Sequence, residues 1–397
     1  MNSKSEQRVT KYIFTASFLI STITLVLLAV RLPLRSYIAA SCLFGAILVL
    51  GYISIGFFFD KHRRLAGLIL LVSILNLILV PAEAILRLRG FRYESGIQFG
   101  YPRPYQFTVF ESNEKLFWRF PPGQPGINSY GFRESEIERP KPPGTFRIIF
   151  IGNSCTYQGH PKEIERILRE KDPGIECLNF ANPGYTSYQG KVIVRSYLDE
   201  LEPDILVVSF GWNDRWLAYG TVDEDKVVTV SQGTTARAVR AINSNWRFLQ
   251  FLRKVFSPIF GAIEPLDQSR VPPDHFRANL ETIGRECTNR GIPVIFATEP
   301  SAHERYGVPD YVVISKYAKN KEASLVLLGR YNDIVREVAG GHDGWHLIDL
   351  DAMISDRDDV QALFTGDGLH YSEEGLALVA EIEARYIKEH LLEIPER

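Results

Sequence analysis

The sequence predicts an α/β protein, a three-layer α/β/α sandwich around a parallel five-stranded sheet, preceded by three transmembrane helices. The first observation is an alternation of short apolar runs with helix-length segments from Phe146 onward, the pattern of a parallel sheet covered on both faces by helices. The second is a set of three apolar runs near the N-terminus, each about 20 residues long and therefore able to cross a bilayer as a helix.

The composition is that of a globular protein, with 45% hydrophobic and 23% charged residues among 397. A chain of this length predicts two or three units. The formal net charge of -2 and the lack of a basic stripe with interleaved aromatics give no indication of nucleic-acid binding. The four cysteines are Cys42, Cys155, Cys177 and Cys287. Their spacing contains no CxxC pair, so neither a metal knuckle nor a redox motif is predicted.

Residues 1–89 are expected to form a membrane domain. Its apolar runs are Tyr12–Val30, Ser36–Phe59 and Leu65–Leu86. Three successive long runs favour transmembrane helices over a cleaved signal peptide, and buried helices of a soluble core are the alternative. The placement of Lys and Arg slightly favours a cytoplasmic N-terminus. We therefore expect a multi-pass membrane protein in which the part of the chain after the third run lies outside the cytoplasm.

Residues 90–145 are rich in Pro, Gly and aromatic side chains, which excludes a long helix. The aromatics are Phe107, Phe110, Phe117, Trp118 and Phe120. They are too many for a free linker, so we expect short strands and turns that pack against the next domain or the membrane surface. A plain tether is the alternative.

Residues 146–397 are expected to form the catalytic domain. Predicted strands cover 146–152, 175–180, 204–210, 292–298 and 345–350. Predicted helices cover 161–170, 187–201, 276–290, 321–338 and 372–390. The third strand is apolar almost throughout, as the interior of a parallel sheet requires. Two insertions, 215–272 and 299–320, are long enough to predict lids or substrate walls.

Four polar clusters follow predicted strands or precede the last helix. They are Gly152–Thr156, Asn182–Gly184, Gly211–Asp214 and Asp367–His370. The carboxyl ends of parallel strands share one edge of a sheet, where active sites gather. We therefore expect the four clusters to form one site.

The residue types in these clusters suit nucleophilic catalysis. A serine hydroxyl such as that of Ser154 needs a base to remove its proton. His370 is the candidate base, and Asp367 can accept the other ring N–H and stabilise the imidazolium. The backbone N–H groups of Ser154 and Gly184 and the side-chain amide of Asn213 can stabilise an oxyanion.

Each cluster alone has a simpler interpretation. Gly-Asn-Ser is commonly a turn, while Asp367 and His370 could be a capping aspartate and a surface histidine. Cys155 is a rival nucleophile, but we expect it to point into the helix packing. His160 lacks an acidic partner in sequence, and a surface or capping role is expected for it.

Together, the clusters resemble the SGNH (GDSL) hydrolase family, from about Arg147 to Glu389. The matching residues, block by block, are Gly152-Asn153-Ser154, Gly184, Gly211 with Asn213 and Asp214, and Asp367 with His370. The one departure is Asn153, where the family usually has aspartate, at a position that supports the turn. The resemblance implies a flavodoxin-like fold, a Ser154–His370–Asp367 triad and an oxyanion hole formed by Ser154, Gly184 and Asn213.

The resemblance, with the predicted anchor, implies a serine esterase that acts on an O-acyl group, with O-acetyl as the leading case. The ester could be carried by a glycan or a lipid. One alternative is an O-acyltransferase that modifies a cell-surface polysaccharide through the same acyl-serine, with a membrane partner for acyl transfer. Another is a degenerate carbohydrate-binding protein.

Asn153, Trp212 and Asp214 are candidate substrate-binding residues. Trp212 could stack on a sugar ring or line an acyl pocket, with core packing as its alternative. Asp214 could instead cap the segment that follows it. No metal is predicted, because His303, His342 and His346 lack ligand spacing. No cofactor is predicted either, because the sequence contains neither a GxGxxG nor a P-loop pattern.

Overall fold

The structure, a computed structural model, describes Tyr12 and residues 82–83, 85–91, 110–227, 246–256 and 265–392. The chain divides into a smaller unit (residues 1–95 and 237–261) and a larger unit (residues 96–236 and 262–397). Within the described residues, no helix has the length and apolar character needed to cross a bilayer. The three predicted transmembrane helices lie almost entirely outside the described residues.

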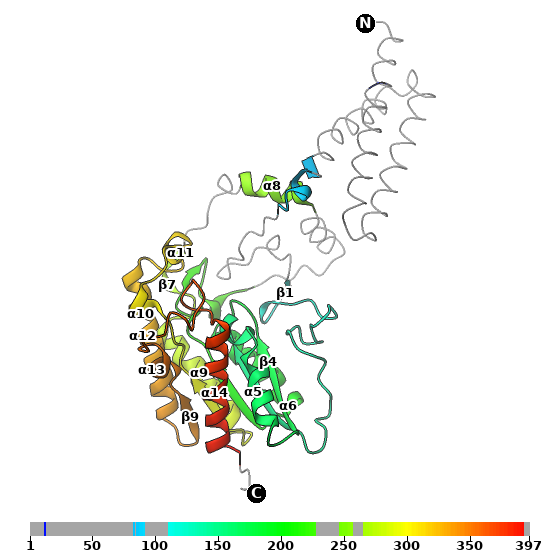
Figure 1. Cartoon of the computed structure of the whole chain (residues 1–397), viewed down its shortest axis with the longest axis vertical. Coiled ribbons are helices and arrows are strands. Elements are labelled where there is room, and N and C mark those ends of the chain that lie inside the picture. The colour runs from blue at the N-terminus through cyan, green and yellow to red at the C-terminus, as the bar shows by residue number, and fades with distance from the viewer. Residues whose placement is uncertain are drawn as a thin grey trace. The chain divides into compact units, whose positions relative to one another are not determined.

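The larger unit is built on a parallel sheet with strand order β4-β3-β5-β8-β9 (Figure 1). The strands are β3 (Phe146–Gly152), β4 (Ile175–Ala181), β5 (Ile205–Ser209), β8 (Val294–Ala297) and β9 (Trp345–Ile348). Gly152 lies opposite both Ala181 and Ser209, so three strands end at one edge. The predicted five-stranded parallel sheet is confirmed.

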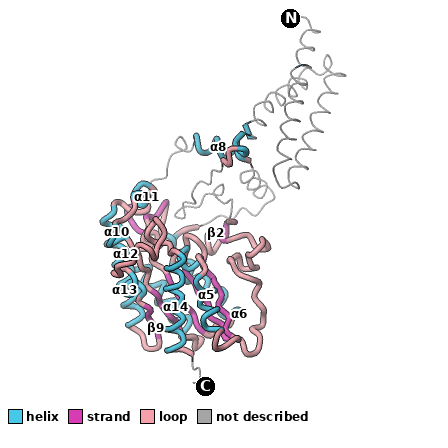
Figure 2. The backbone as a smooth tube through the Cα atoms, in the orientation of Figure 1, coloured by secondary structure: helices cyan, strands magenta, loops and turns pink. Residues whose placement is uncertain are grey.

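Alternate residues of each strand enter the two helical layers on opposite faces of the sheet, as the strand period of two requires. Ile149 and Ile151 pack in one core with α6 (Ser187–Leu201), α9 (Pro273–Thr288) and α12 (Lys321–Gly340). Ile148 and Phe150 pack in the other core with α5 (His160–Arg169) and α14 (Glu373–His390). Figure 2 shows the strands flanked by these helices.

Among the described residues of the larger unit, the five long helices were predicted to within a few residues. Four short helices were not predicted, namely α4 (Ser154–Tyr157), α10 (His303–Tyr306), α11 (Asp310–Ile314) and α13 (Leu350–Ile354). Segments of four or five residues are too short to show a helical period, so the sequence gives no signal for them.

The described part of the accessory segment packs as part of the larger unit. Its strands β1 (Glu111–Asn113) and β2 (Phe117–Arg119) form an antiparallel hairpin. Phe117, Trp118 and Phe132 are fully buried in the core that also holds α6. The indole N–H of Trp118 donates to the carbonyl of Pro183 at 3.2 Å. This part of the chain is therefore packed against the core of the larger unit and is not a free tether.

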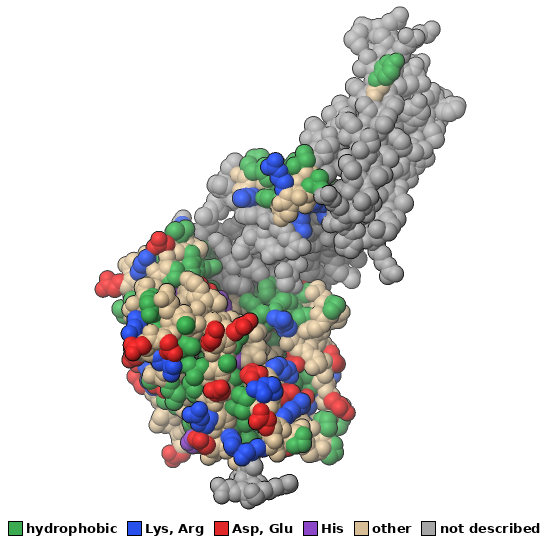
Figure 3. Space-filling view, in the orientation of Figure 1, with side chains coloured by type: hydrophobic (Ala, Val, Ile, Leu, Met, Phe, Trp, Pro, Cys, Tyr) green, Lys and Arg blue, Asp and Glu red, His purple; other side chains and the backbone are tan. Residues whose placement is uncertain are grey.

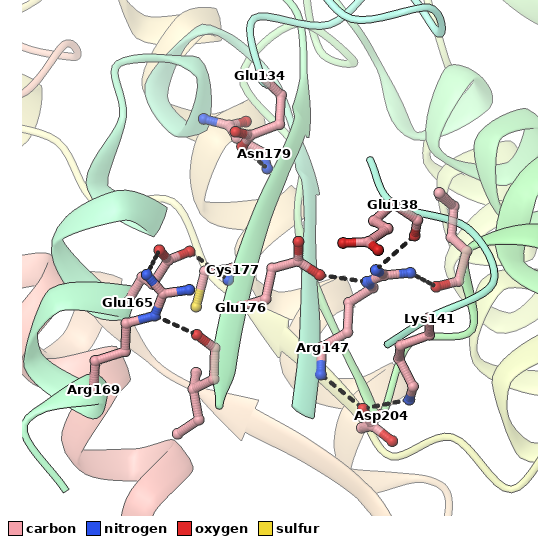
Figure 4. A network of polar contacts seen from close by, with 12 residues as sticks. Glu134, Glu138, Lys141, Arg147, Glu165, Arg169, Glu176, Cys177, Asn179 and Asp204 are labelled. Atoms are coloured by element: carbon pink, nitrogen blue, oxygen red, sulfur yellow. Dashed lines mark hydrogen bonds and ion pairs between the residues drawn. The ribbon is translucent and has the colours of Figure 1, made fainter. Parts of the chain in front are cut away.

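A buried arginine joins this segment to the sheet at the amino-terminal ends of the strands, opposite the carboxyl edge. The guanidinium of Arg147, on β3, donates to Glu176 on β4 and to the carbonyls of Glu138 and Leu201 (Figure 4). Asp204 accepts from the backbone N–H of Arg147 at 2.7 Å. Because a buried charge is tolerated only when it is paired and hydrogen-bonded, this network fixes the start of β3.

The first insertion contains regular structure in both units. In the larger unit, β6 (Leu217–Tyr219) pairs with β7 (Pro265–Ser269), and the 3₁₀ helix η2 (Asp223–Asp225) lies between them in sequence. In the smaller unit the insertion forms α8 (Arg247–Phe256). The prediction of a lid or substrate wall did not anticipate these elements.

Candidate active site

Ser154 lies at the turn where β3 meets α4. β3 ends at Gly152, and Asn153 caps α4 by accepting the Cys155 N–H at 2.9 Å. A Cβ on Gly152 would come within 2.2 Å of the Thr156 hydroxyl, so the tight turn requires glycine. The turn places Ser154, which is half-buried, at the carboxyl edge of the sheet.

Three predicted side chains form one hydrogen-bonded chain. His370 Nε2 lies 2.9 Å from Ser154 Oγ, and His370 Nδ1 lies 2.6 Å from Asp367 Oδ2. These separations are within hydrogen-bonding reach for a nucleophile, its base and the group that orients the base. The three side chains therefore lie at the separations that the predicted roles require.

Asp367 is held in its ionised form. Burial alone would raise its pKa, but hydrogen bonds from the His370 side chain and from the backbone N–H groups of His370 and Leu369 outweigh burial and hold the pKa well below its usual range. The hydroxyl of Thr365 donates to Oδ1 as well, at 2.8 Å. A fixed negative charge beside Nδ1 favours the tautomer that leaves Nε2 free to accept the Ser154 proton.

The predicted oxyanion-hole residues lie on neighbouring loops. Gly184 has φ +82°, a left-handed conformation that favours glycine. The Asn213 amide donates one hydrogen to the Tyr185 carbonyl at 2.9 Å, which links the loops after β4 and β5. A primary amide has two N–H donors, and the Tyr185 carbonyl accepts one of them.

The loop that carries Gly184 is held by a buried ion pair. Arg270 donates to the Gly184 carbonyl at 2.8 Å and to Asp223 at 2.8 Å. Both charged side chains are fully buried. Burial would raise the pKa of Asp223, but the positive charges of Arg270 and Lys226 outweigh it and lower that pKa. Buried residues of the first insertion therefore hold the loop that carries Gly184, one of the predicted oxyanion-hole residues.

The structure does not place the predicted substrate-binding residues at an open surface. Asn153 and Asp214 are fully buried and Trp212 is 2% exposed. Asp214 accepts the Ser187 N–H at the start of α6, and burial raises its pKa to about 7. Trp212 belongs to the core, with the Arg215 guanidinium 4.4 Å from its ring centroid. Their polar or aromatic groups are used in supporting contacts, which corrects the substrate-binding assignment.

Two supporting residues were missed by the sequence analysis, Glu299 and His303. The carboxylate of Glu299 accepts hydrogen bonds from the Asn153 side chain and the Trp212 N–H. His303 Nε2 lies 2.8 Å from the Asp367 carbonyl oxygen. Both residues belong to the second insertion, where no periodic pattern or motif marks them. Their supporting roles depend on tertiary contacts, which the sequence does not show.

The two other candidates in this region are core residues. Cys155 is 3% exposed, and burial, followed by the charges of Glu299 and Asp367, raises the pKa of its thiol well above the ordinary value. A thiol that stays protonated is a poor nucleophile. His160 is buried against Glu383, with 3.3 Å between the ring nitrogen and the carboxylate. The expected surface or capping role of His160 is therefore corrected.

A cavity of about 630 Å³ adjoins the loop that carries Asp367. Its lining includes His303, Tyr306, Asp310, Gln361, Thr365 and Gly368. Several of these residues come from the second insertion, which was predicted to form a substrate wall. The lining includes neither Ser154 nor His370.

Comparison with known families identifies the chain. The model of the GDSL-like Lipase/Acylhydrolase family matches residues 150–378, which include Ser154 and His370. The chain belongs to the GDSL-like lipase/acylhydrolase family. It is accordingly a carboxylic ester hydrolase, and the predicted family resemblance is confirmed.

Solved structures of low sequence identity also match this GDSL-like hydrolase. A lipase/acylhydrolase from Enterococcus faecalis is 20% identical and covers 64% of this chain and 100% of its own, with a TM-score of 0.41. A mutant acetylxylan esterase from Geobacillus stearothermophilus is 14% identical and covers 65% and 100%, with a TM-score of 0.40. No curated protein matches the chain.

Proposed function

We propose that this chain is a membrane-anchored serine esterase that removes an O-acyl group, with O-acetyl as the leading case. The observation that carries the proposal is the hydrogen-bonded chain from Ser154 through His370 to Asp367. It supplies a nucleophile, a base and a fixed anion at the edge of the sheet, where a substrate can approach.

The reaction begins with attack of Ser154 Oγ on the acyl carbon. Its proton passes to His370 Nε2, and Asp367 stabilises the resulting imidazolium. The carbonyl oxygen becomes an oxyanion that accepts from the Ser154 and Gly184 N–H groups and from Asn213. One such donor contributes about 3–4 kcal/mol to transition-state stabilisation.

Collapse of the tetrahedral intermediate breaks the bond to the alcohol oxygen. His370 donates its proton to that oxygen. The alcohol then departs, and the acyl group remains bound to Ser154. Water then attacks the acyl-serine while His370 accepts its proton, and the second collapse returns that proton to Ser154. The carboxylic acid is released. A sugar hydroxyl in place of water would give the acyltransferase outcome.

Membrane anchoring is supported by the sequence of residues 1–89. Three apolar runs of about 20 residues each match the length needed to cross a hydrocarbon core. We propose that they anchor the chain and that the hydrolase lies outside the cytoplasm, following the slight excess of basic residues on the cytoplasmic side.

The test is active-site labelling of the detergent-solubilised full chain with a fluorophosphonate, combined with measurement of acetate release from an acetyl ester. We expect wild type to be labelled at Ser154 and to release acetate. Ser154→Ala should lose both, because no other activated hydroxyl occupies that position.

Cys155→Ala is the matched control, since it removes the neighbouring thiol and leaves the triad intact. It should retain labelling. Loss of labelling in Cys155→Ala with retention in Ser154→Ala would exclude Ser154 as the nucleophile. A folded wild type that neither reacts with the probe nor releases acid would reject the esterase proposal.

A further inference from the structure

Helix α8 has an apolar face that points outward. Phe248, Phe251, Leu252 and Val255 recur at the spacing of one helical face. Phe251 and Val255 are exposed, as is Trp246 just before the helix. A helix of a soluble core buries this face, whereas in α8 two of its four side chains are exposed and the other two are half-buried.

One polar side chain of α8, that of Gln250, is buried, whereas Lys254, one turn later on the same side, is exposed. Gln250 is only 3% exposed, whereas Val255 is 48% exposed. The Arg247 guanidinium donates to Gln250 at 3.0 Å along the same face. The burial of Gln250 and the exposure of Val255 therefore occur on different sides of the same helix.

The contacts that hold α8 come from the segment after the third apolar run. Glu83 accepts the backbone N–H groups of Arg247 and Phe248 at 3.0 and 2.7 Å, and so caps the start of the helix. The rings of Phe91 and Phe251 meet edge to face at 6.1 Å. Residues 82–91 and 246–256 therefore pack together, although about 155 residues separate them in sequence.

The combined surface is both apolar and basic. Residues 82–91 add exposed Ile85 and Leu88. The described side chains of the two segments include four basic residues (Arg87, Arg89, Arg247 and Lys254) and one acidic residue, Glu83, which pairs with Arg87. Figure 3 shows hydrophobic and basic side chains next to one another on the surface over α8.

We propose that α8 is an interfacial helix that lies on the surface of an anionic bilayer, with Trp246, Phe251, Val255 and Phe256 in the lipid. Apolar residues with Trp and Phe beside Lys and Arg are the composition of such helices, and anionic headgroups supply the complementary charge. The inference rests on the membrane anchoring proposed above. It adds a second attachment point, inside an insertion of the hydrolase domain.

The contact between α8 and the end of the third apolar run favours a bilayer over a protein as the partner of this helix. Glu83, which caps α8, lies within the third apolar run, Leu65–Leu86, whose length suits a membrane span. The end of that span would lie at the headgroup layer. A helix fixed directly to it is therefore presented to the same layer.

The test uses the full chain in lipid nanodiscs that contain phosphatidylglycerol. Val255→Cys, in a Cys42→Ser background, is labelled with an environment-sensitive fluorophore and quenched with nitroxide lipids. The other native thiols, those of Cys155, Cys177 and Cys287, are buried. Val326→Cys is the matched control, because Val326 is an exposed valine on helix α12.

We expect quenching at position 255 to be severalfold stronger than at position 326, and to weaken when phosphatidylcholine replaces the anionic lipid. Equal quenching at the two positions in a chain retained by the disc would overturn the inference alone. Quenching independent of lipid charge would overturn the headgroup component. A chain that elutes without the disc would overturn the anchor and the inference together, whereas acetate release from the same sample tests the esterase separately.

Discussion

Asn153 and Glu299 form a pair behind the nucleophile, at the position where the family usually has an aspartate. The Asn153 side chain has a donor as well as an acceptor, and it uses both. Its oxygen accepts the Cys155 N–H, and its nitrogen donates to Glu299. An ionised aspartate has no N–H to donate, so it could make the second bond only by accepting a hydrogen bond from a protonated oxygen of Glu299. The departure at residue 153 is therefore matched by an acid at residue 299.

Burial raises the pKa of Glu299 to about 8, above its ordinary value near 4.5. A carboxyl group whose pKa is raised in the fold stabilises the protein fully below the ordinary pKa and loses that contribution as pH rises through the folded pKa. We expect the free energy of unfolding to fall between pH 5 and pH 8, by at most ~1.4 kcal/mol per pH unit from this group.

Glu299→Gln should remove this pH-dependent contribution to the free energy of unfolding, although it also weakens the contact with Asn153. The measurement is chemical denaturation of both proteins at several pH values. Asp214, whose pKa is also raised and whose charge raises the pKa of Glu299, titrates in both proteins. Parallel pH profiles for wild type and Glu299→Gln would show that Glu299 does not titrate in this range.

At this scale the sequence predicts the residues that share a motif and misses those that act through the fold. Ser154, His370 and Asp367 were predicted to meet because each lies in a short block with its own chemistry. Glu299 and His303 lie in an insertion without such a block. Trp212 and Asp214 were assigned to substrate because sequence alone does not separate a buried polar side chain from an exposed one.

At the scale of elements, the first insertion holds the loop that carries Gly184 in place. Arg270 follows β7 and reaches the Gly184 carbonyl, while Asp223 on η2 holds Arg270 and accepts the Thr186 hydroxyl at 2.9 Å. Removing one partner of a buried ion pair costs about 3–5 kcal/mol, because the other charge is left uncompensated. A variant that keeps the charge is therefore the better probe.

Arg270→Lys keeps the positive charge near Asp223 but loses the planar guanidinium that bridges to Gly184. We expect kcat for acetate release to fall, up to the ~100-fold loss typical of one oxyanion donor, with little change in KM. Arg277→Lys is the matched control, since Arg277 forms an ion pair on the exposed side of α9. If both variants keep wild-type kcat, Arg270 has no positioning role.

The elements themselves differ in how much of them the sequence could predict. Continuous apolar runs such as Ile205–Ser209 predicted the parallel strands, because buried strands have few alternatives at that length. The hairpin β1–β2 and the antiparallel pair β6–β7 have strands of three to five residues. Such strands have too few residues to show an alternation, and they depend on the core against which they pack.

At the scale of the whole molecule, the proposed anchor predicts how the chain partitions. The full chain should remain with membranes during extraction at alkaline pH in carbonate, because three apolar spans are not released by removing charge interactions. A chain beginning at Gly96, the first residue of the larger unit, should move substantially into the supernatant. Release of the full chain under the same conditions would contradict the anchor.

The burial of the accessory segment limits how this hydrolase can be recombined. From the sequence, residues 145 and 146 mark a domain boundary, because a proline-rich stretch precedes the first strand of the sheet. A gene fusion made there would strip Phe117, Trp118 and Phe132 from the core and leave the loop before Gly184 without its Trp118 contact. The transferable module therefore includes the segment before the first strand, and any natural or engineered exchange of anchors should leave that segment attached to the enzyme.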